Sequence, residues 1–136
     1  MKSSILLFVA MLISGIAVQN QNPAQDFVAI LQEAFDNQQS DIQVQGEGIV
    51  IRILSDDLVA PRHQRFIIRI SPKQTLLVAH NIDIANRVPD LQLNSTIEFY
   101  GEYEWNLEGG VIHWTHYAPD GDHLDGWLKY AGKTYR

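Results

Sequence analysis

The stretch Ile97–His116, IEFYGEYEWNLEGGVIHWTH, decides the fold class of this chain. Apolar and aromatic residues alternate with acidic ones up to Trp105, and a second apolar run begins after a pair of glycines. Alternation with a period of about two residues is typical of a β-strand with one buried face, and glycines between two such runs indicate a hairpin. The stretch therefore predicts two antiparallel strands, at 96–105 and 111–118.

The register of this hairpin follows from its buried face. A loop from Leu107 to Gly110 pairs Glu104 with His113. In this register one face carries the apolar side chains, which are Phe99, Tyr103, Trp105, Ile112 and Trp114. The opposite face carries the polar ones, which are Glu98, Glu102, Glu104, His113 and Thr115. A slip of one residue would mix the two sets, and burial of one face opposes such a slip.

The β-pattern extends over most of the chain. Further segments rich in Val, Ile, Phe and Tyr lie at 43–54, 64–71, 75–80 and 123–135, with turn signals between them. Three strands, a short helix and two strands is the order of an oligonucleotide/oligosaccharide-binding (OB) barrel. We therefore predict a mainly β chain that forms a small OB-like Greek-key barrel. A β-sandwich and a small α+β roll remain alternatives.

Two helices are predicted beside the strands. Between residues 23 and 38, apolar residues recur at the spacing of an amphipathic helix, and they are Phe27, Ile30, Leu31, Ala34 and Phe35. Asn22 and Pro23 suit the N-cap and the first helical position. A short helix at 81–89, stopped before a proline, is predicted between the third and fourth strands.

The first residues predict export. Lys2, the apolar run 5–13 and small residues at Gly15 and Ala17 are typical of a Sec-type signal peptide that is cleaved after Ala17. A membrane anchor is the alternative, but the apolar run is shorter than the roughly 20 residues that span a bilayer. We therefore expect a periplasmic or extracellular protein with no membrane anchor after cleavage. The expected divisions are a signal peptide at 1–17, a helical segment at 18–41 and a barrel domain at 42–136.

Net charge and cysteine content argue against several classes of function. The formal net charge is −6 and becomes −7 when Lys2 leaves with the signal peptide. Proteins that bind nucleic acid through its phosphates carry a basic surface, so nucleic acid is disfavoured as a partner. The chain has no cysteine, which excludes disulfides, thiol nucleophiles and cysteine-bound zinc. No P-loop, dinucleotide-binding glycine pattern or serine nucleophile elbow is present.

The polar face of the hairpin holds the candidate catalytic residues, Glu102, Glu104 and His113. A carboxylate beside an imidazole raises the pKa of the imidazole and fixes its orientation, as a general acid or base requires. The alternative is a solvated cross-strand pair that contributes about 0.2–1 kcal/mol to stability.

The stretch 113–127, HWTHYAPDGDHLDGW, holds the candidate metal ligands, which are His116, Asp120, Asp122, His123 and Asp125. Zinc or manganese would suit such ligands, but their spacing specifies neither ion, and the calcium-loop pattern is incomplete. An ordinary turn is the alternative for this segment, and a satisfied core histidine is the alternative for His116. The sequence requires no cofactor.

Candidate binding residues lie in the loops and strand ends that flank the ligand face of an OB barrel. They are Arg62, His63, Arg65, His80, Asn81, Asp83, Trp105 and Trp114. Arginine can grip an anion with its fork of N–H groups. The alternatives are solvated arginines that balance nearby aspartates, and capping roles for Asn81 and Asp83.

Four blocks of the sequence, RHQRFIIRI, LLVAHNIDIANRV, EFYGEYEWN with GGVIHWTH, and GWLKYAGKTY, form a familiar set. Together they resemble a family of short exported bacterial proteins catalogued as a domain of unknown function. The resemblance runs from about Val44 to Tyr135. It implies a single exported domain and supplies no catalytic assignment.

We therefore expect a binding module whose polar and aromatic face takes a small anionic, saccharide or peptide partner. The alternative is an envelope or secreted hydrolase acting on a phosphodiester or glycosidic bond, with or without a metal ion. In that enzyme Glu102 or Glu104 and His113 would exchange protons, and Arg62 or Arg65 would stabilise the developing anion. A protein inhibitor or a structural envelope protein is a third class.

Overall fold

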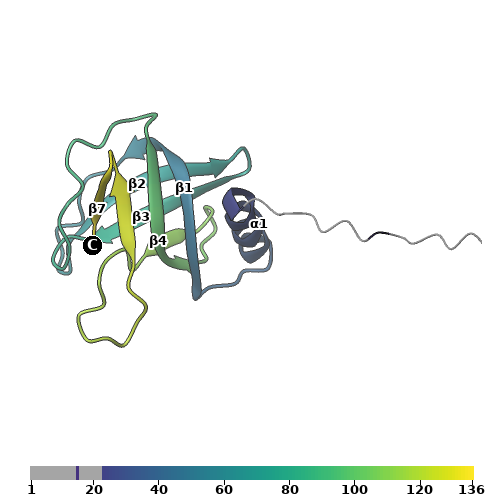
Figure 1. Cartoon of the computed structure of the whole chain (residues 1–136). Coiled ribbons are helices and arrows are strands. Elements are labelled where there is room, and N and C mark those ends of the chain that lie inside the picture. Colours follow the sequence, from purple (N-terminus) through teal and green to yellow (C-terminus); the bar gives the residue numbers. More distant parts are fainter. Residues whose placement is uncertain (1–14, 16–22) are drawn as a thin grey trace, which may run out of the picture.

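A computed structural model describes Gly15 and residues 23–136 of the chain (Figure 1). The predicted signal peptide and the predicted N-cap Asn22 therefore lie outside the described residues, apart from Gly15. The elements in chain order are α1 (Pro23–Asp36), β1 (Ile42–Ile53), β2 (His63–Ser71), β3 (Gln74–Asn81), β4 (Thr96–Glu104), β5 (Val111–His113), β6 (Trp127–Tyr130) and β7 (Lys133–Tyr135). The chain is mainly β, as predicted. No helix among the described residues is long and apolar enough to cross a membrane.

Five of the strands close into a barrel. Hydrogen-bonded neighbours run in the order β1-β2-β3-β5-β4, and β4 pairs back onto β1. All of these pairings are antiparallel except that of β3 with β5, which is parallel. Along β3 and β4 burial alternates residue by residue, so every second side chain points into the barrel.

The two short C-terminal strands extend the sheet. β6 pairs with the first half of β4, at Glu98 to Tyr100, whereas β5 pairs with its second half, at Glu102 to Glu104. One edge of β4 is therefore shared by two strands. The segment 114–126 connects them and forms the long loop below the barrel in Figure 1.

Helix α1 packs beside β1 at one end of the barrel (Figure 1). The ring of Phe27 meets Phe99 edge-on, with 6.3 Å between the ring centroids. A Cβ atom on Gly46 would lie 2.6 Å from the Phe27 ring, so the close approach of helix and strand requires glycine there. The Gln74 side chain donates to the carbonyls of Leu31 and Gly109 and ties the helix to the strand ends.

The core joins the helix and the barrel interior in one cluster. Its buried members are Phe27, Leu31, Ala34, Val44, Val50, Phe66, Ile68, Leu76, Val78, Val88, Leu91, Ile97, Phe99, Tyr103, Ile112 and Leu128. The hydroxyl of Tyr103 donates to the Gly109 carbonyl at 3.0 Å. Gly110, with a φ of +112°, leaves room for the Tyr103 ring, because a Cβ there would lie 2.0 Å from it.

The prediction of a short helix at 81–89 is wrong, because this segment forms turns. Side chains form hydrogen bonds with backbone groups that would pair with each other in a helix. The Asn81 carboxamide oxygen accepts from the Asp83 N–H at 2.9 Å. The buried Gln64 amide bonds both the N–H and the carbonyl of Val88, each at 2.9 Å. The local bond of Asn81 and the long-range bonds of Gln64 together hold the segment in a non-helical path.

The predicted hairpin register is wrong by two residues. Glu104 pairs with Val111, Tyr103 with Ile112 and Glu102 with His113. A shift of two keeps each residue on its predicted face, because side chains alternate with the same period. Tyr103 and Ile112 are therefore buried as predicted.

The second strand of this hairpin is also shorter than predicted. It ends at His113 instead of residue 118, because Trp114 has a φ of +56° and turns the chain out of the sheet. Trp114 is consequently displaced from the apolar face that the alternation predicts for it.

Candidate functional site

The site lies on the outer face of the barrel, where β2, β3, β5 and β4 run side by side. Arg65 pairs with Ala79, and Glu102 pairs with His113. β3 and β5 run parallel, and Val78 pairs with Ile112. The next residues along the two strands, Ala79 and His113, are therefore also neighbours. A row of outward side chains therefore crosses the barrel in the order Arg65, Ala79, His113, Glu102. Alanine in the second place leaves space between the flanking residues.

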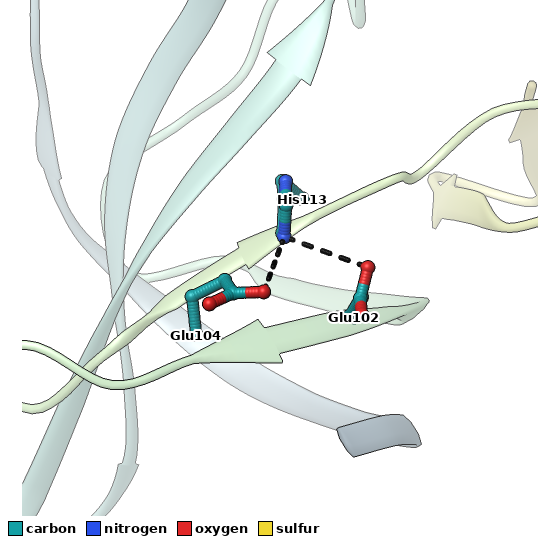
Figure 2. A group of neighbouring side chains, drawn as sticks. All are labelled: Glu102, Glu104 and His113. Carbon is teal, nitrogen blue, oxygen red and sulfur yellow. Dashed lines mark ion pairs between the residues drawn. The ribbon is translucent and has the colours of Figure 1, made fainter. Parts of the chain in front are cut away.

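Glu102, Glu104 and His113 converge, as the sequence predicts for the polar face (Figure 2). The Nε2 atom of His113 lies 3.7 Å from Oε2 of Glu102 and 3.5 Å from Oε1 of Glu104. The three ligand atoms all lie within 4.8 Å of one another. Figure 2 shows one ring nitrogen of His113 directed at both carboxylates, which come from the neighbouring strand.

The charge around this cluster is predominantly negative. Burial, together with the neighbouring Asp41 and Glu102 carboxylates, raises the pKa of Glu104, whereas His113 acts in the opposite direction. In the described part of the chain, every ion pair of Glu102 and Glu104 is with a histidine. No lysine or arginine of the described residues therefore neutralises these carboxylates directly.

His123 is a further member that the sequence did not connect with the cluster. Its Nε2 lies 2.6 Å from Oε2 of Glu102, and its Nδ1 lies 2.8 Å from the Leu124 carbonyl. Burial lowers the pKa of His123, but the bonds to Leu124 and Glu102 outweigh it, and the net shift is upward. The ring stacks on Trp114, with 4.0 Å between centroids and an interplanar angle of 5°.

A pocket of about 190 Å³ lies beside the cluster. Its lining residues are His63, Ala79, Asn81, Ile84, His113, Trp114 and His116, and none of them is acidic. The oxygen of the Asn81 carboxamide is engaged with the Asp83 N–H, so its NH₂ group is the part offered to a ligand. His113 belongs both to this pocket and to the carboxylate cluster.

Two predicted site histidines are held in the protein interior. His80 lies inside the barrel, where its Nδ1 is 2.7 Å from the Thr115 hydroxyl and its Nε2 is 2.9 Å from the Asn86 carbonyl. His116 is buried and its Nδ1 lies 2.6 Å from the Tyr117 carbonyl. His80 therefore serves packing, while His116 also lines the pocket.

The predicted arginines do not reach the carboxylate cluster. Arg62 forms an ion pair with Asp83 at 2.7 Å. Arg65 donates through Nε and Nη2 to the Ser55 carbonyl at 3.1 and 3.0 Å.

Trp105 is not at the site either. Its indole N–H donates to the carbonyl of Phe35 at 3.1 Å, at the end of α1. This bond and its packing against the core make Trp105 a link between helix and barrel.

The candidate metal ligands in 116–125 do not meet as a set. Asp120 and Asp122 are exposed, and the Asp125 carboxylate accepts from the Ala118 N–H at 2.8 Å. Among the residues that the structure describes, the group of His, Asp and Glu atoms close enough to hold a metal is Glu102, Glu104 and His113. No sequence signal places His123 beside Glu102, because a long irregular loop separates β5 from β6.

The comparisons with known proteins agree with the resemblance in the sequence blocks. The model of a family described as "Protein of unknown function (DUF3465)" matches residues 11–136. The chain belongs to this family. The family match covers the whole barrel and every residue of the cluster and the pocket. No curated protein and no solved structure is significantly similar to the chain.

The family description carries no activity. Any function of this DUF3465 member must therefore be argued from the geometry of its outer face.

Proposed function

We propose that the chain is a binding module that takes a small anionic ligand in the pocket beside His113. The observation that carries this proposal is the lining of the pocket: three imidazoles and the Asn81 carboxamide, groups that can donate N–H bonds, line it, and no carboxylate does. The volume of about 190 Å³ suits a ligand of few atoms, because drug-sized ligands occupy about 300–1,000 Å³.

A saccharide or a peptide is less well supported as the ligand. Sugars usually stack on an open aromatic face, but one face of Trp114 is covered by His123. Trp105 is turned toward the helix, and the Lys129 ammonium lies over the Trp127 ring at 5.2 Å.

We also propose that the barrel is of the OB type. Support comes from the closed strand order β1-β2-β3-β5-β4 and from the single parallel pairing of β3 with β5. In OB barrels the face of strands 2 and 3 binds ligands. The pocket borders this face through His63 of β2 and Asn81 of β3.

The hydrolase alternative has one observation in its favour, the meeting of Glu102, Glu104 and His113. The arginine support that it requires is missing, because Arg62 and Arg65 are engaged elsewhere. Binding is therefore the better proposal.

Export to the periplasm or the medium remains a proposal based on residues 1–17. Mass spectrometry of the protein recovered from cell fractions tests it. We expect a mature N-terminus at Val18 or a neighbouring residue in the periplasmic or extracellular fraction, and an intact N-terminus in the cytoplasm would contradict export.

An NMR titration of the ¹⁵N-labelled chain tests the ligand class, with acetate, inorganic phosphate, N-acetylglucosamine and a short neutral peptide as probes. We expect an anion to shift the side-chain signals of His63, Asn81 and His116. The variant Asn81→Asp keeps the acceptor for the Asp83 N–H but puts a carboxylate in the pocket, so it should weaken anion binding at least about 10-fold.

The control is Asn94→Asp, which adds the same charge at an exposed position outside the pocket. It should leave anion binding unchanged. Pocket shifts caused only by the sugar or the peptide, or by none of the probes, would contradict the proposal.

A further inference from the structure

We propose that Glu102, Glu104 and His113 form a binding site for a divalent transition-metal ion, with zinc as the ion to test. This site is separate from the proposed anion pocket, although the two share His113. The inference does not depend on the pocket ligand, because metal binding is measured without it.

The spacing of the three atoms is the first argument. Separations of 3.5 and 3.7 Å between His113 Nε2 and the carboxylate oxygens exceed normal hydrogen-bond lengths of about 2.7–3.2 Å. Bonds of about 2.0–2.1 Å in a tetrahedral zinc site put neighbouring ligand atoms roughly 3.3 Å apart. Small side-chain movements would therefore bring all three atoms into ligand positions around one ion.

The state of His113 is the second argument. Its Nε2 atom is buried and has no hydrogen-bond partner among the described residues. Buried polar atoms are nearly always satisfied, so an unsatisfied one calls for an explanation. A cation between this nitrogen and the two carboxylates would satisfy all three groups.

Charge is the third argument. Asp41 adds a further carboxylate beside Glu104, and the direct ion pairs of Glu102 and Glu104 in the described chain involve only histidines. A bound divalent cation would offset this concentration of negative charge.

The fourth argument is rigidity. Glu102 and His113 are directly paired residues of neighbouring strands, and Glu104 follows on the same face. His123 holds the Glu102 carboxylate at 2.6 Å and is itself stacked on Trp114. Ligands on strands, oriented by a hydrogen-bonded partner, are held more precisely than ligands on loops.

The donor set selects the class of metal. One imidazole nitrogen and two carboxylates suit zinc, and also manganese or cobalt. Calcium prefers about six to eight oxygen ligands, which this face does not offer. Three protein ligands would leave a coordination position open to water or to an anion.

Isothermal titration of the purified, chelator-treated chain with ZnCl₂ at neutral pH tests the proposal. We expect an equimolar amount of zinc to bind. Glu104→Gln and His113→Asn should each weaken binding at least about 100-fold, since even loss of a group that merely orients a ligand costs about 10–100-fold. Co²⁺ should give visible absorption bands of a low-coordinate site, and these should be lost in both variants.

The matched control is His63→Asn, because His63 lies on the same outer face and lines the pocket but is not in the cluster. Its zinc affinity should equal that of the unmodified chain. Glu104→Gln preserves size and shape, so it decides the question if His113→Asn fails to fold. Three results would each overturn the proposal. They are failure of the unmodified chain to bind zinc, an unchanged zinc affinity in folded Glu104→Gln, and a loss of affinity in His63→Asn as large as that in the cluster variants.

Discussion

At the scale of single residues, His80 is an imidazole held inside the barrel between two fixed partners. The Asn86 carbonyl can only accept, so Nε2 carries the proton and Nδ1 accepts from the Thr115 hydroxyl. Burial lowers the pKa of His80 from 6.5 to about 4, the Asn86 carbonyl partly opposes this, and His116 and His63 add to the lowering. The folded protein therefore holds His80 neutral.

This burial predicts a loss of stability in mild acid. The unfolded chain takes up the proton near pH 6.5, whereas the folded chain takes it up only near pH 4. Above pH 6.5 His80 is neutral in both states, and it does not reduce the free energy of unfolding. As the pH falls from 6.5 toward 4, protonation of His80 in the unfolded chain lowers the free energy of unfolding by up to about 3 kcal/mol. Urea unfolding at several pH values between 4 and 6.5 measures this change in the free energy of unfolding. The variant His80→Gln should show a shallower pH dependence, and an unchanged slope would contradict the assignment.

The residue His123 can also be tested by itself. It orients the Glu102 carboxylate, so His123→Gln should weaken zinc binding by about 10–100-fold without abolishing it. Titration together with the Co²⁺ absorption spectrum checks this, because a merely structural role would leave the shape of the spectrum unchanged. Binding equal to that of the unmodified chain would show that His123 does not position the ligand.

At the scale of elements, helix α1 is joined to the barrel by apolar packing. Leu31 is fully buried, whereas the adjacent Ile30 is 45% exposed. Leu31→Ala should therefore lower the free energy of unfolding by about 2–5 kcal/mol, while Ile30→Ala should change it by less than about 1 kcal/mol. Urea denaturation of both variants checks this. Equal effects would mean that the helix is not part of the core.

The strands could be predicted from sequence because burial imposes alternation, and Tyr103 and Ile112 lie on the buried face as expected. The register could not be fixed, because a slip of two residues leaves every side chain on the same face. The turn at 81–89 depends on Gln64, far away in sequence, so local propensity for a helix was overridden. The positive φ of Trp114, which shortens β5, has no local sequence signal.

The same limits apply to the site. The polar face with Glu102, Glu104 and His113 follows from alternation alone, and the structure brings these residues together. The approach of His123 to Glu102 depends on the path of an irregular loop. The arginines were expected near the carboxylates, but their bonding partners Asp83 and Ser55 direct them elsewhere.

At the scale of the whole molecule, one core connects every large element. Phe27 of α1, Phe66 of β2, Ile112 of β5 and Leu128 of β6 belong to the same buried cluster. A single core of this kind favours cooperative unfolding. An ion that binds only the folded chain then stabilises the whole molecule.

The proposed zinc site therefore predicts a gain in overall stability. Its ligands lie on β4 and β5, which are both part of the barrel, and the unfolded chain has no cysteine to compete for zinc. At free zinc of about 100 times Kd, the free energy of unfolding should rise by about 2.7 kcal/mol. Thermal and urea unfolding with and without zinc measure this, and EDTA should reverse the effect. At the same zinc concentration the Glu104→Gln variant should gain no more than about 0.4 kcal/mol, because its affinity is at least about 100-fold weaker while its core is the same. An equal gain in that variant would mean that zinc stabilises the fold from another place.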